Sequence, residues 1–205
     1  MSSAAPTAAA QRPSRKWRVI DIVVASALAI VCGLVFWAWN IGYEIPSAAL
    51  EAVIPGLSGL TAAPWLLAGV LGGLVIRKPG AALYVGIVAA LLSMLFGAKW
   101  GTDTLVSGIL QGLGAEIVFA AFLYRYYGLL VAMLAGAAAA ALEAPHQLIV
   151  WYSEATIEWQ IIYSASMIVS GALIAGIGAW LIMKVLVVSG ALDRFAAGRD
   201  RVARV

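Results

Sequence analysis

Residues 20–39 read IDIVVASALAIVCGLVFWAW, an apolar run in which Asp21 is the single charged side chain. A helix needs about 20 apolar residues to cross the hydrocarbon core of a bilayer, so this run predicts a membrane-spanning helix. The run is longer than the apolar core of a secretory signal peptide, which has about 7–15 residues, and no small-residue cleavage site follows it closely. We therefore expect this helix to remain in the mature protein.

The same apolar character extends over the whole chain of 205 residues. Hydrophobic residues make up 63% and charged residues 11%, and the mean hydropathy is +0.98. A soluble domain carries roughly a quarter charged residues, so the composition excludes a water-soluble enzyme. It also excludes a disordered chain, which combines low hydrophobicity with high charge. Cys32 is the single cysteine, so no disulfide can form within the chain.

Six stretches are long and apolar enough to be spans, and they leave no room for a soluble domain. The predicted spans are residues 20–39, 60–76, 81–98, 105–124, 129–151 and 161–188. We predict an all-α integral membrane protein with a bundle of six transmembrane helices. The bundle occupies residues 17–190, between a disordered arm (1–16) and a basic tail (191–205).

The charged residues divide between the two sides of this bundle. Of the 13 Lys and Arg residues, Lys99 alone falls in a loop on the second side. Cytoplasmic loops carry an excess of Lys and Arg, so both termini are expected in the cytoplasm. An even number of helices agrees with this, because it places both termini on the same side. The acidic residues of the three outer loops are Glu44, Glu51, Asp103, Glu154 and Glu158. The net charge of +3 thus reflects topology, and it allows contacts with anionic lipid rather than nucleic acid.

Tryptophan is also distributed unequally. The tryptophans of the outer half are Trp37, Trp39, Trp65, Trp100, Trp151 and Trp159, whereas the inner half has Trp17 and Trp180. Aromatic belts at the two membrane interfaces would be symmetric. The excess predicts an aromatic-lined site that opens outward. An amphipathic stretch at 47–54, in the first outer loop, is suited to lie at the interface or to cap such a site.

Ionisable groups within spans are few. Glu116 lies near the middle of the span 105–124, close to Gln111. Glu143 and His146 lie in the outer half of the span 129–151, where their spacing places them on one helix face. Such groups cost about 2.5–3.5 kcal/mol on insertion scales and are usually functional.

Several interpretations of these groups stay open. A zinc site at Glu143 and His146 is poorly supported, because zinc needs three or four ligands and His146 is the single histidine. A hydrogen-bonded cluster between helices is the structural alternative. A ligand site is the third, since carboxylates, amides and Trp faces together suit a cationic or amine-bearing ring. No G-x-x-x-x-G-K-[ST] motif occurs, so the chain cannot hold ATP by itself. No metal or cofactor is expected.

Small residues four apart form stripes on several spans. The first span carries Ala25, Ala29 and Gly33. Such stripes let helices approach closely in lipid. The stripe can serve packing within the chain or the docking of another protein, and the sequence does not distinguish the two.

Two blocks of sequence match a known family. They are Arg77-Lys-Pro-Gly-Ala-Ala-Leu83, and Gly97-Ala-Lys-Trp-Gly101 followed by Gly108-Ile-Leu-Gln-Gly-Leu-Gly-Ala-Glu116 and Phe119. With these blocks the chain resembles the YkoE-like substrate-binding (S) components of energy-coupling-factor (ECF) transporters, which are linked to thiamine and its hydroxymethylpyrimidine precursor. The resemblance covers most of residues 17–190 and is most specific over 97–125.

This resemblance implies six transmembrane helices, a bacterial plasma-membrane location and a vitamin site near the outer face. It also implies partners, namely a transmembrane coupling (T) component and two cytoplasmic ATPases that supply ATP hydrolysis. In S components for other vitamins a small-residue stripe of the first helix docks the T component, and Ala25, Ala29 and Gly33 occupy that place. An S component for another vitamin or a metal ion, and an intramembrane enzyme using Glu143 and His146, are the alternatives.

Ligand contacts are chosen from the residues themselves rather than transferred from the family. The first choices are Glu116, Gln111, Trp100, Glu143, His146 and Trp151, and the second choices are Trp39, Asn40, Tyr84, Trp159 and Tyr163. Glu116 is the expected principal contact to an aminopyrimidine ring. Its structural alternative is a carboxyl group hydrogen-bonded to a neighbouring helix.

Overall fold

The computed structural model describes residues 15–193, 195 and 197–198 and contains helices but no strand within them. The predicted arm and tail therefore lie largely outside the described residues. The elements are α1 (Val19–Gly42), α2 (Glu44–Val53), η1 (Leu57–Ala62), α3 (Ala63–Ile76), α4 (Ala81–Leu95), α5 (Asp103–Ala121), α6 (Leu129–Val150), α7 (Ile157–Ser170), η2 (Gly171–Gly176) and α8 (Ile177–Val188).

The all-helical membrane bundle predicted from the sequence is confirmed. Five continuous helical segments are long and apolar enough to cross a membrane, and α4 is a shorter apolar helix of 15 residues. It ends before the predicted boundary because Gly97 adopts a φ of 89°, in the left-handed region that stops a helix. α5 likewise ends early, since Leu123 and Tyr124 have φ values of 53° and 54°. The amphipathic stretch of the first outer loop forms α2.

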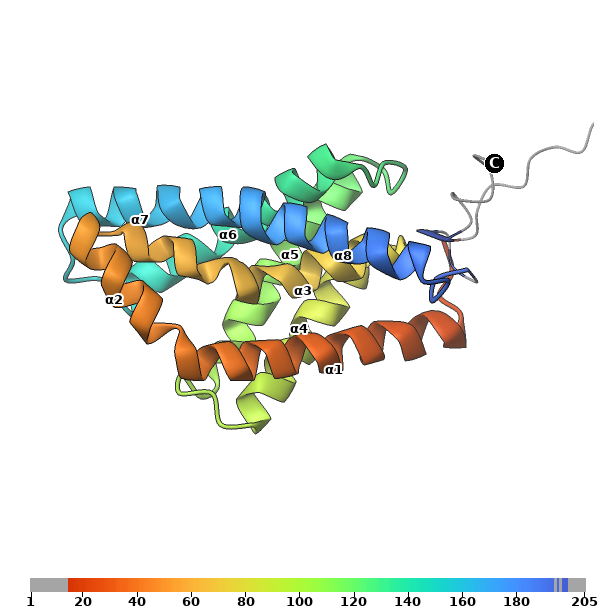
Figure 1. Ribbon diagram of the computed structural model, residues 1–205, viewed down its shortest axis with the longest axis horizontal. Helices are drawn as coiled ribbons and strands as arrows, with labels where there is room; N and C mark the ends of the chain where they lie inside the picture. The colour runs from red at the N-terminus through yellow and green to blue at the C-terminus, as the bar shows by residue number, and fades with distance from the viewer. Residues whose placement is uncertain (1–14, 194, 196, 199–205) are drawn as a thin grey trace, which may run out of the picture.

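The central helix of the bundle is α3. Eleven of its fourteen residues are buried, and it packs against α1, α4, α5 and α8. Figure 1 shows α3 between α1 and the rod formed by α7 and α8, while α4 and α5 run steeply across that direction. The last span is one continuous rod with a π-helical turn, η2, in its middle. There a Cβ on Gly136 of α6 would lie 2.0 Å from the carbonyl oxygen of Gly171, so this helix contact requires glycine.

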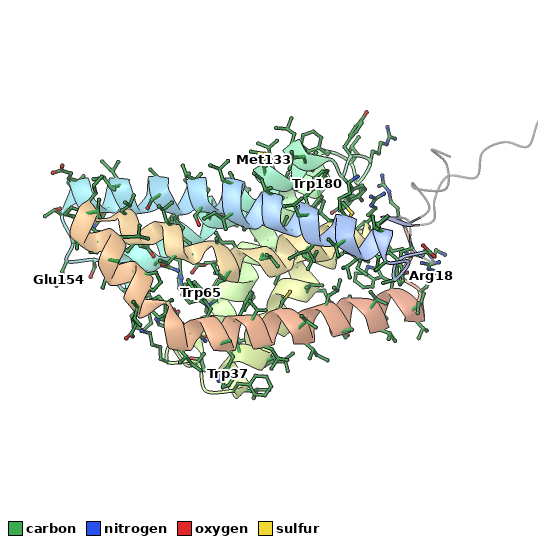
Figure 2. The ribbon with its side chains drawn as sticks, viewed as in Figure 1. Arg18, Trp37, Trp65, Met133, Glu154 and Trp180 are labelled. Atoms are coloured by element: carbon green, nitrogen blue, oxygen red, sulfur yellow. The ribbon has the colours of Figure 1, made fainter. Side chains whose placement is uncertain are left out.

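The two ends of the bundle differ in charge. We call proximal the end where α1 and α4 begin and α8 ends, and distal the end where α5 and α7 begin. Figure 2 shows Arg18 at the proximal end and Glu154 at the distal end. Buried Asp21 pairs with Arg18 and Lys78 at the proximal end, and Lys99 bonds Glu44 at the distal end. Which end faces the cytoplasm stays a prediction.

The small-residue stripe of α1 faces inward rather than outward. Ala25 and Ala29 are fully buried in the chain itself, and α1 packs against α4. A Cβ on Gly33 would lie 2.9 Å from the Cβ of Leu92 and 3.0 Å from the carbonyl oxygen of Ala89. The expected docking stripe is thus already covered by α4. This burial agrees with internal packing, the alternative interpretation, and docking of a partner through the stripe stays a prediction.

Candidate functional site

A pocket lies at the distal end, among α1, α2, η1, α3, α4, α5, α6 and α7. The space between its walls, including the solvent at its mouth, is about 800 Å³. Its lining side chains are mostly aromatic or uncharged polar. Those used below are Asn40, Tyr43, Trp65, Trp100, Asp103, Thr104, Gln111, Gln147, Trp151, Tyr152 and Tyr163. We call this the distal pocket.

Three rings form an aromatic box on one side of the distal pocket. The ring centroids of Tyr43, Trp65 and Trp100 are 5.1, 5.6 and 5.4 Å apart in their three pairs. Lys99 Nζ sits 4.5 Å from the centroid of Tyr43 and 5.0 Å from that of Trp100. Burial is the largest influence on Lys99 and opposes its charge, but the interactions with Glu44 and Tyr43 together outweigh burial and raise the pKa of the ammonium group. The box thus already attracts a cation through its ring faces.

The amide groups of the pocket differ in how far they are satisfied. The Asn40 carbonyl accepts from Trp65 Nε1 at 2.8 Å, and its amide donates to Ser93 at 3.1 Å. Gln111 is buried, yet its side chain makes no hydrogen bond within the described residues. The buried Thr104 hydroxyl also has no partner there. Buried polar groups are normally paired, so these two point to a ligand or water.

A chain of polar contacts runs behind the pocket wall. The Trp151 indole donates to Asp103 at 2.8 Å, and His146 Nε2 lies 3.1 Å from the same carboxylate. His146 Nδ1 lies 3.6 Å from Glu143, which is fully buried. Gln147 donates to Glu143 at 3.1 Å. The contacts therefore hold Glu143 and His146 directly behind the lining side chains of Asp103 and Gln147.

The far end of this chain is a second aromatic group. Tyr163 donates to the Gln147 carbonyl at 2.5 Å and stacks on Trp159, with centroids 4.8 Å apart and planes 11° apart. The Trp159 indole donates to Glu51 of α2. Burial raises the pKa of Glu51, but hydrogen bonds from Trp159, the backbone N–H of Gly56 and Ser58 together outweigh burial, and the pKa lies below its ordinary value. The link ties α2 to α7 over the pocket.

The structure brings most of the expected site residues together. Those that line the pocket are Asn40, Trp100, Gln111, Trp151 and Tyr163. Glu143 and His146 stand one contact behind the lining. Trp39 packs on Trp65 at 6.4 Å and donates to the Thr61 carbonyl, so it flanks the box as Trp159 flanks Tyr163.

Glu116, the expected principal contact, does not line the distal pocket. Its carboxylate accepts from the backbone N–H groups of Gly80, Ala82 and Leu83 at 2.6, 2.9 and 3.4 Å, and from Tyr124 OH at 2.7 Å. The first turn of a helix leaves its N–H groups without partners, and Glu116 satisfies those of α4. These hydrogen bonds are those of the structural alternative, and a ligand contact by Glu116 stays a prediction.

Tyr84 also lies away from the pocket. Its hydroxyl is 2.7 Å from that of Ser26, and its ring meets Trp17 edge-on at 5.7 Å near the start of α1. The position of a residue along the sequence does not give its depth in the bundle. Glu116 and Tyr84 belong to the proximal half.

Sequence reasoning missed other lining residues. Tyr43, Trp65 and Asp103 line the pocket but are not among the ligand contacts expected from the sequence. The excess of distal tryptophan was the available signal for Trp65. Asp103 meets Trp151 across 48 residues of sequence, a contact that no local pattern gives. Within the described residues no group of three or more His, Cys, Asp or Glu side chains is arranged to hold a metal ion.

Three comparisons relate the chain to known proteins. The family model described as "ABC-type cobalt transport system, permease component" matches residues 20–142. A Bacillus subtilis (strain 168) protein named "Putative HMP/thiamine permease protein YkoE" is 33% identical over 188 residues, which cover 91% of this chain and 92% of that protein. A solved structure described as "Crystal structure of an S-component of ECF transporter" matches with a TM-score of 0.85 and 32% identity, over 92% of this chain and 95% of that chain.

Proposed function

Because the chain belongs to the YkoE-like family of ECF-transporter S components, we propose that it captures thiamine or its hydroxymethylpyrimidine precursor in the distal pocket. It is a multi-pass plasma-membrane protein. The homologous protein is named for hydroxymethylpyrimidine (HMP) and thiamine, which supports this choice of ligand. On this proposal the distal end faces outward, in agreement with the distribution of basic residues.

One observation carries the proposal: polar side chains without a hydrogen-bond partner in the described chain line the same pocket as an aromatic box. Gln111 and Thr104 have no partner in the described chain and lie in the same pocket as Tyr43, Trp65 and Trp100. An aminopyrimidine ring stacks on aromatic faces, and an amide can donate to its ring nitrogens or accept from its amine. The thiazolium of thiamine is a cation, which ring faces attract.

Gln147 is the second amide that we assign to the ligand. Its amide nitrogen donates to Glu143 and its carbonyl accepts from Tyr163, so both ends of the amide are held in one orientation. Preorganised polar groups bind a ligand at lower entropic cost than mobile ones. Glu143 and Tyr163 therefore position Gln147, and Asp103 places a carboxylate at the same wall.

We propose that transport itself depends on a T component and two ATPases. The sequence has no P-loop, and S components work as the substrate-binding part of a larger transporter. The stripe of Ala25, Ala29 and Gly33 can dock the T component only if α1 first separates from α4, because α4 covers it.

The proposal is tested by titrating the purified chain in detergent with thiamine and with hydroxymethylpyrimidine, by calorimetry. Trp100→Ala should weaken binding at least about tenfold, since a stacking ring contributes roughly 1 kcal/mol beyond its buried area. The matched control is Trp37→Ala, because Trp37 is 40% exposed and lies outside the pocket. Gln111→Ala should weaken binding without changing the thermal stability.

The result that overturns the proposal is the absence of binding heat for both compounds at micromolar concentration. A cobalt ion is the competing ligand, because the description of the matching family model names cobalt transport. Titration with Co²⁺ alone separates the two. If the chain binds Co²⁺ but not thiamine, and His146→Ala abolishes the binding of Co²⁺, the ligand is a metal ion rather than a vitamin.

A further inference from the structure

A second cavity lies at the proximal end, between the α5–α6 connection and α8. With its mouth it encloses about 1810 Å³, and we call it the proximal cavity. Its walls come from the end of α3, residues 122–128, the start of α6 and the last turns of α8. Trp180, one of its lining residues, lies in the half of the bundle nearer Arg18 (Figure 2). The distal pocket and the proximal cavity share no lining residue.

The proximal cavity is positively charged. Arg77, Arg125 and Lys184 line it from three different elements, and no Asp or Glu is among its described lining residues. The Arg77 guanidinium lies 4.7 Å from the centroid of the Tyr127 ring, and Lys184 Nζ lies 5.0 Å from that of Trp180. The face of the Trp180 ring holds the Lys184 ammonium group without neutralising its charge. The cavity therefore attracts an anion.

A hydrogen-bond donor without an acceptor lines the same cavity. The buried Tyr127 hydroxyl has no hydrogen-bond partner within the described residues. Burial raises the pKa of this phenol above its ordinary value, so it keeps its proton at neutral pH. An anionic oxygen in the cavity would supply the missing acceptor.

Apolar side chains form the rest of the wall. Leu129 and Leu130, at the start of α6, are 38% and 67% exposed, and both line the cavity. They belong to a helix that is apolar enough to cross the membrane, so this part of the cavity faces hydrocarbon chains. An inorganic anion has no apolar part that could make favourable contacts with these leucine side chains. A molecule with an anionic head and apolar chains satisfies both parts of the cavity.

We propose that the proximal cavity binds one anionic phospholipid of the surrounding leaflet. Its phosphodiester lies against Arg125 and Lys184 and accepts from Tyr127, and its acyl chains run along Leu129 and Leu130. Basic pockets between transmembrane helices are known to hold anionic headgroups. The guanidinium of Arg125 suits a phosphate because its planar donors can bind two oxygens at once.

Native mass spectrometry of the full-length, delipidated protein tests this site. The protein is titrated in parallel with dioleoyl-phosphatidylglycerol and with dioleoyl-phosphatidylcholine, which share acyl chains and differ in charge. We expect one tightly bound phosphatidylglycerol molecule per protein and no phosphatidylcholine molecule bound with comparable affinity. Arg125→Gln and Lys184→Gln should each weaken phosphatidylglycerol binding about fivefold, the value of roughly 1 kcal/mol per cation near lipid.

Two controls separate the site from general charge effects. Lys99→Gln removes the same charge at the distal end and should leave binding within about twofold. Lys184→Arg keeps the charge and should bind as the wild type does, which also covers the case in which Lys184→Gln fails to fold. Tyr127→Phe removes the donor alone and should weaken binding about threefold to fivefold.

Three results would overturn the proposal. Equal affinity for the two lipids would show that charge does not select the ligand. Unchanged phosphatidylglycerol affinity in both Arg125→Gln and Lys184→Gln would place bound lipid elsewhere. Unchanged affinity together with loss of the T component on co-purification of these variants would assign the cavity to a protein partner. Thiamine titration of the same variants reports on the distal pocket separately.

Discussion

Glu116 and Glu143 are the same residue type, both buried in transmembrane helices, and the molecule uses them in opposite ways. Glu116 accepts four hydrogen bonds, three of them from backbone N–H groups. Glu143 accepts from Gln147, and its second oxygen is buried without a partner in the described chain. Burial alone therefore does not identify a functional carboxylate in this bundle. The number of satisfied hydrogen bonds separates the two.

The surroundings explain the difference. Glu116 meets the first turn of α4, where N–H groups need acceptors and the helix dipole favours a negative charge. Glu143 meets side chains instead, namely Gln147 and His146, which connect it to the distal pocket. A carboxylate that completes a helix end stabilises the fold. A carboxylate with an unused oxygen behind a pocket is available to orient the groups that touch a ligand.

The largest effect is expected for Glu116→Ala. The substitution leaves three backbone N–H groups and the Tyr124 hydroxyl without acceptors, and it should lower the stability by roughly 3 kcal/mol or more. Thermal unfolding in detergent, followed by tryptophan fluorescence, measures the loss. The protein that remains folded should bind thiamine with unchanged affinity, because Glu116 lies outside the distal pocket.

The control for this variant is Glu154→Ala, which removes an exposed carboxylate from the distal loop and should leave the melting temperature nearly unchanged. A weakened thiamine affinity with a normal melting temperature in Glu116→Ala would contradict the structural role and restore the ligand contact expected from the sequence.

A second, smaller loss of stability is expected for Ala29→Leu. Ala29 is fully buried against α4, so the larger side chain forces the two helices apart, and overpacking of this kind costs about 2 kcal/mol. Thiamine binding and uptake should fall together. Ala27→Leu is the matched control, because Ala27 is exposed on the same helix. Intact binding with abolished uptake in Ala29→Leu would show instead that the stripe docks a partner.

The sequence predicts the architecture well because length and apolarity decide it. Runs of apolar residues marked every span, and the glycine positions marked close helix contacts such as Gly136 with Gly171. The depth of individual side chains in the bundle is harder to predict, because it depends on helix tilt and on how far each helix runs past its neighbours. Glu116 lies 36 residues from Gly80 in sequence, and nothing local shows that the two meet. The aromatic box draws Tyr43, Trp65 and Trp100 from three separate segments. The uneven distribution of tryptophan therefore predicts an aromatic site but not which rings form it.

The smallest of these effects is expected for Glu143, and it concerns binding rather than folding. Glu143→Ala removes one hydrogen bond to Gln147 and also a buried oxygen without a partner, so its cost to stability should be well below that of Glu116→Ala. Gln147 then loses its fixed orientation at the pocket wall. Thiamine affinity should fall about fivefold, as expected for one hydrogen bond of roughly 1 kcal/mol. Glu143→Gln keeps an acceptor for Gln147 and should restore most of the affinity in calorimetric titration. Equal losses of affinity in the two variants would mean that the charge of Glu143, rather than its hold on Gln147, serves the ligand.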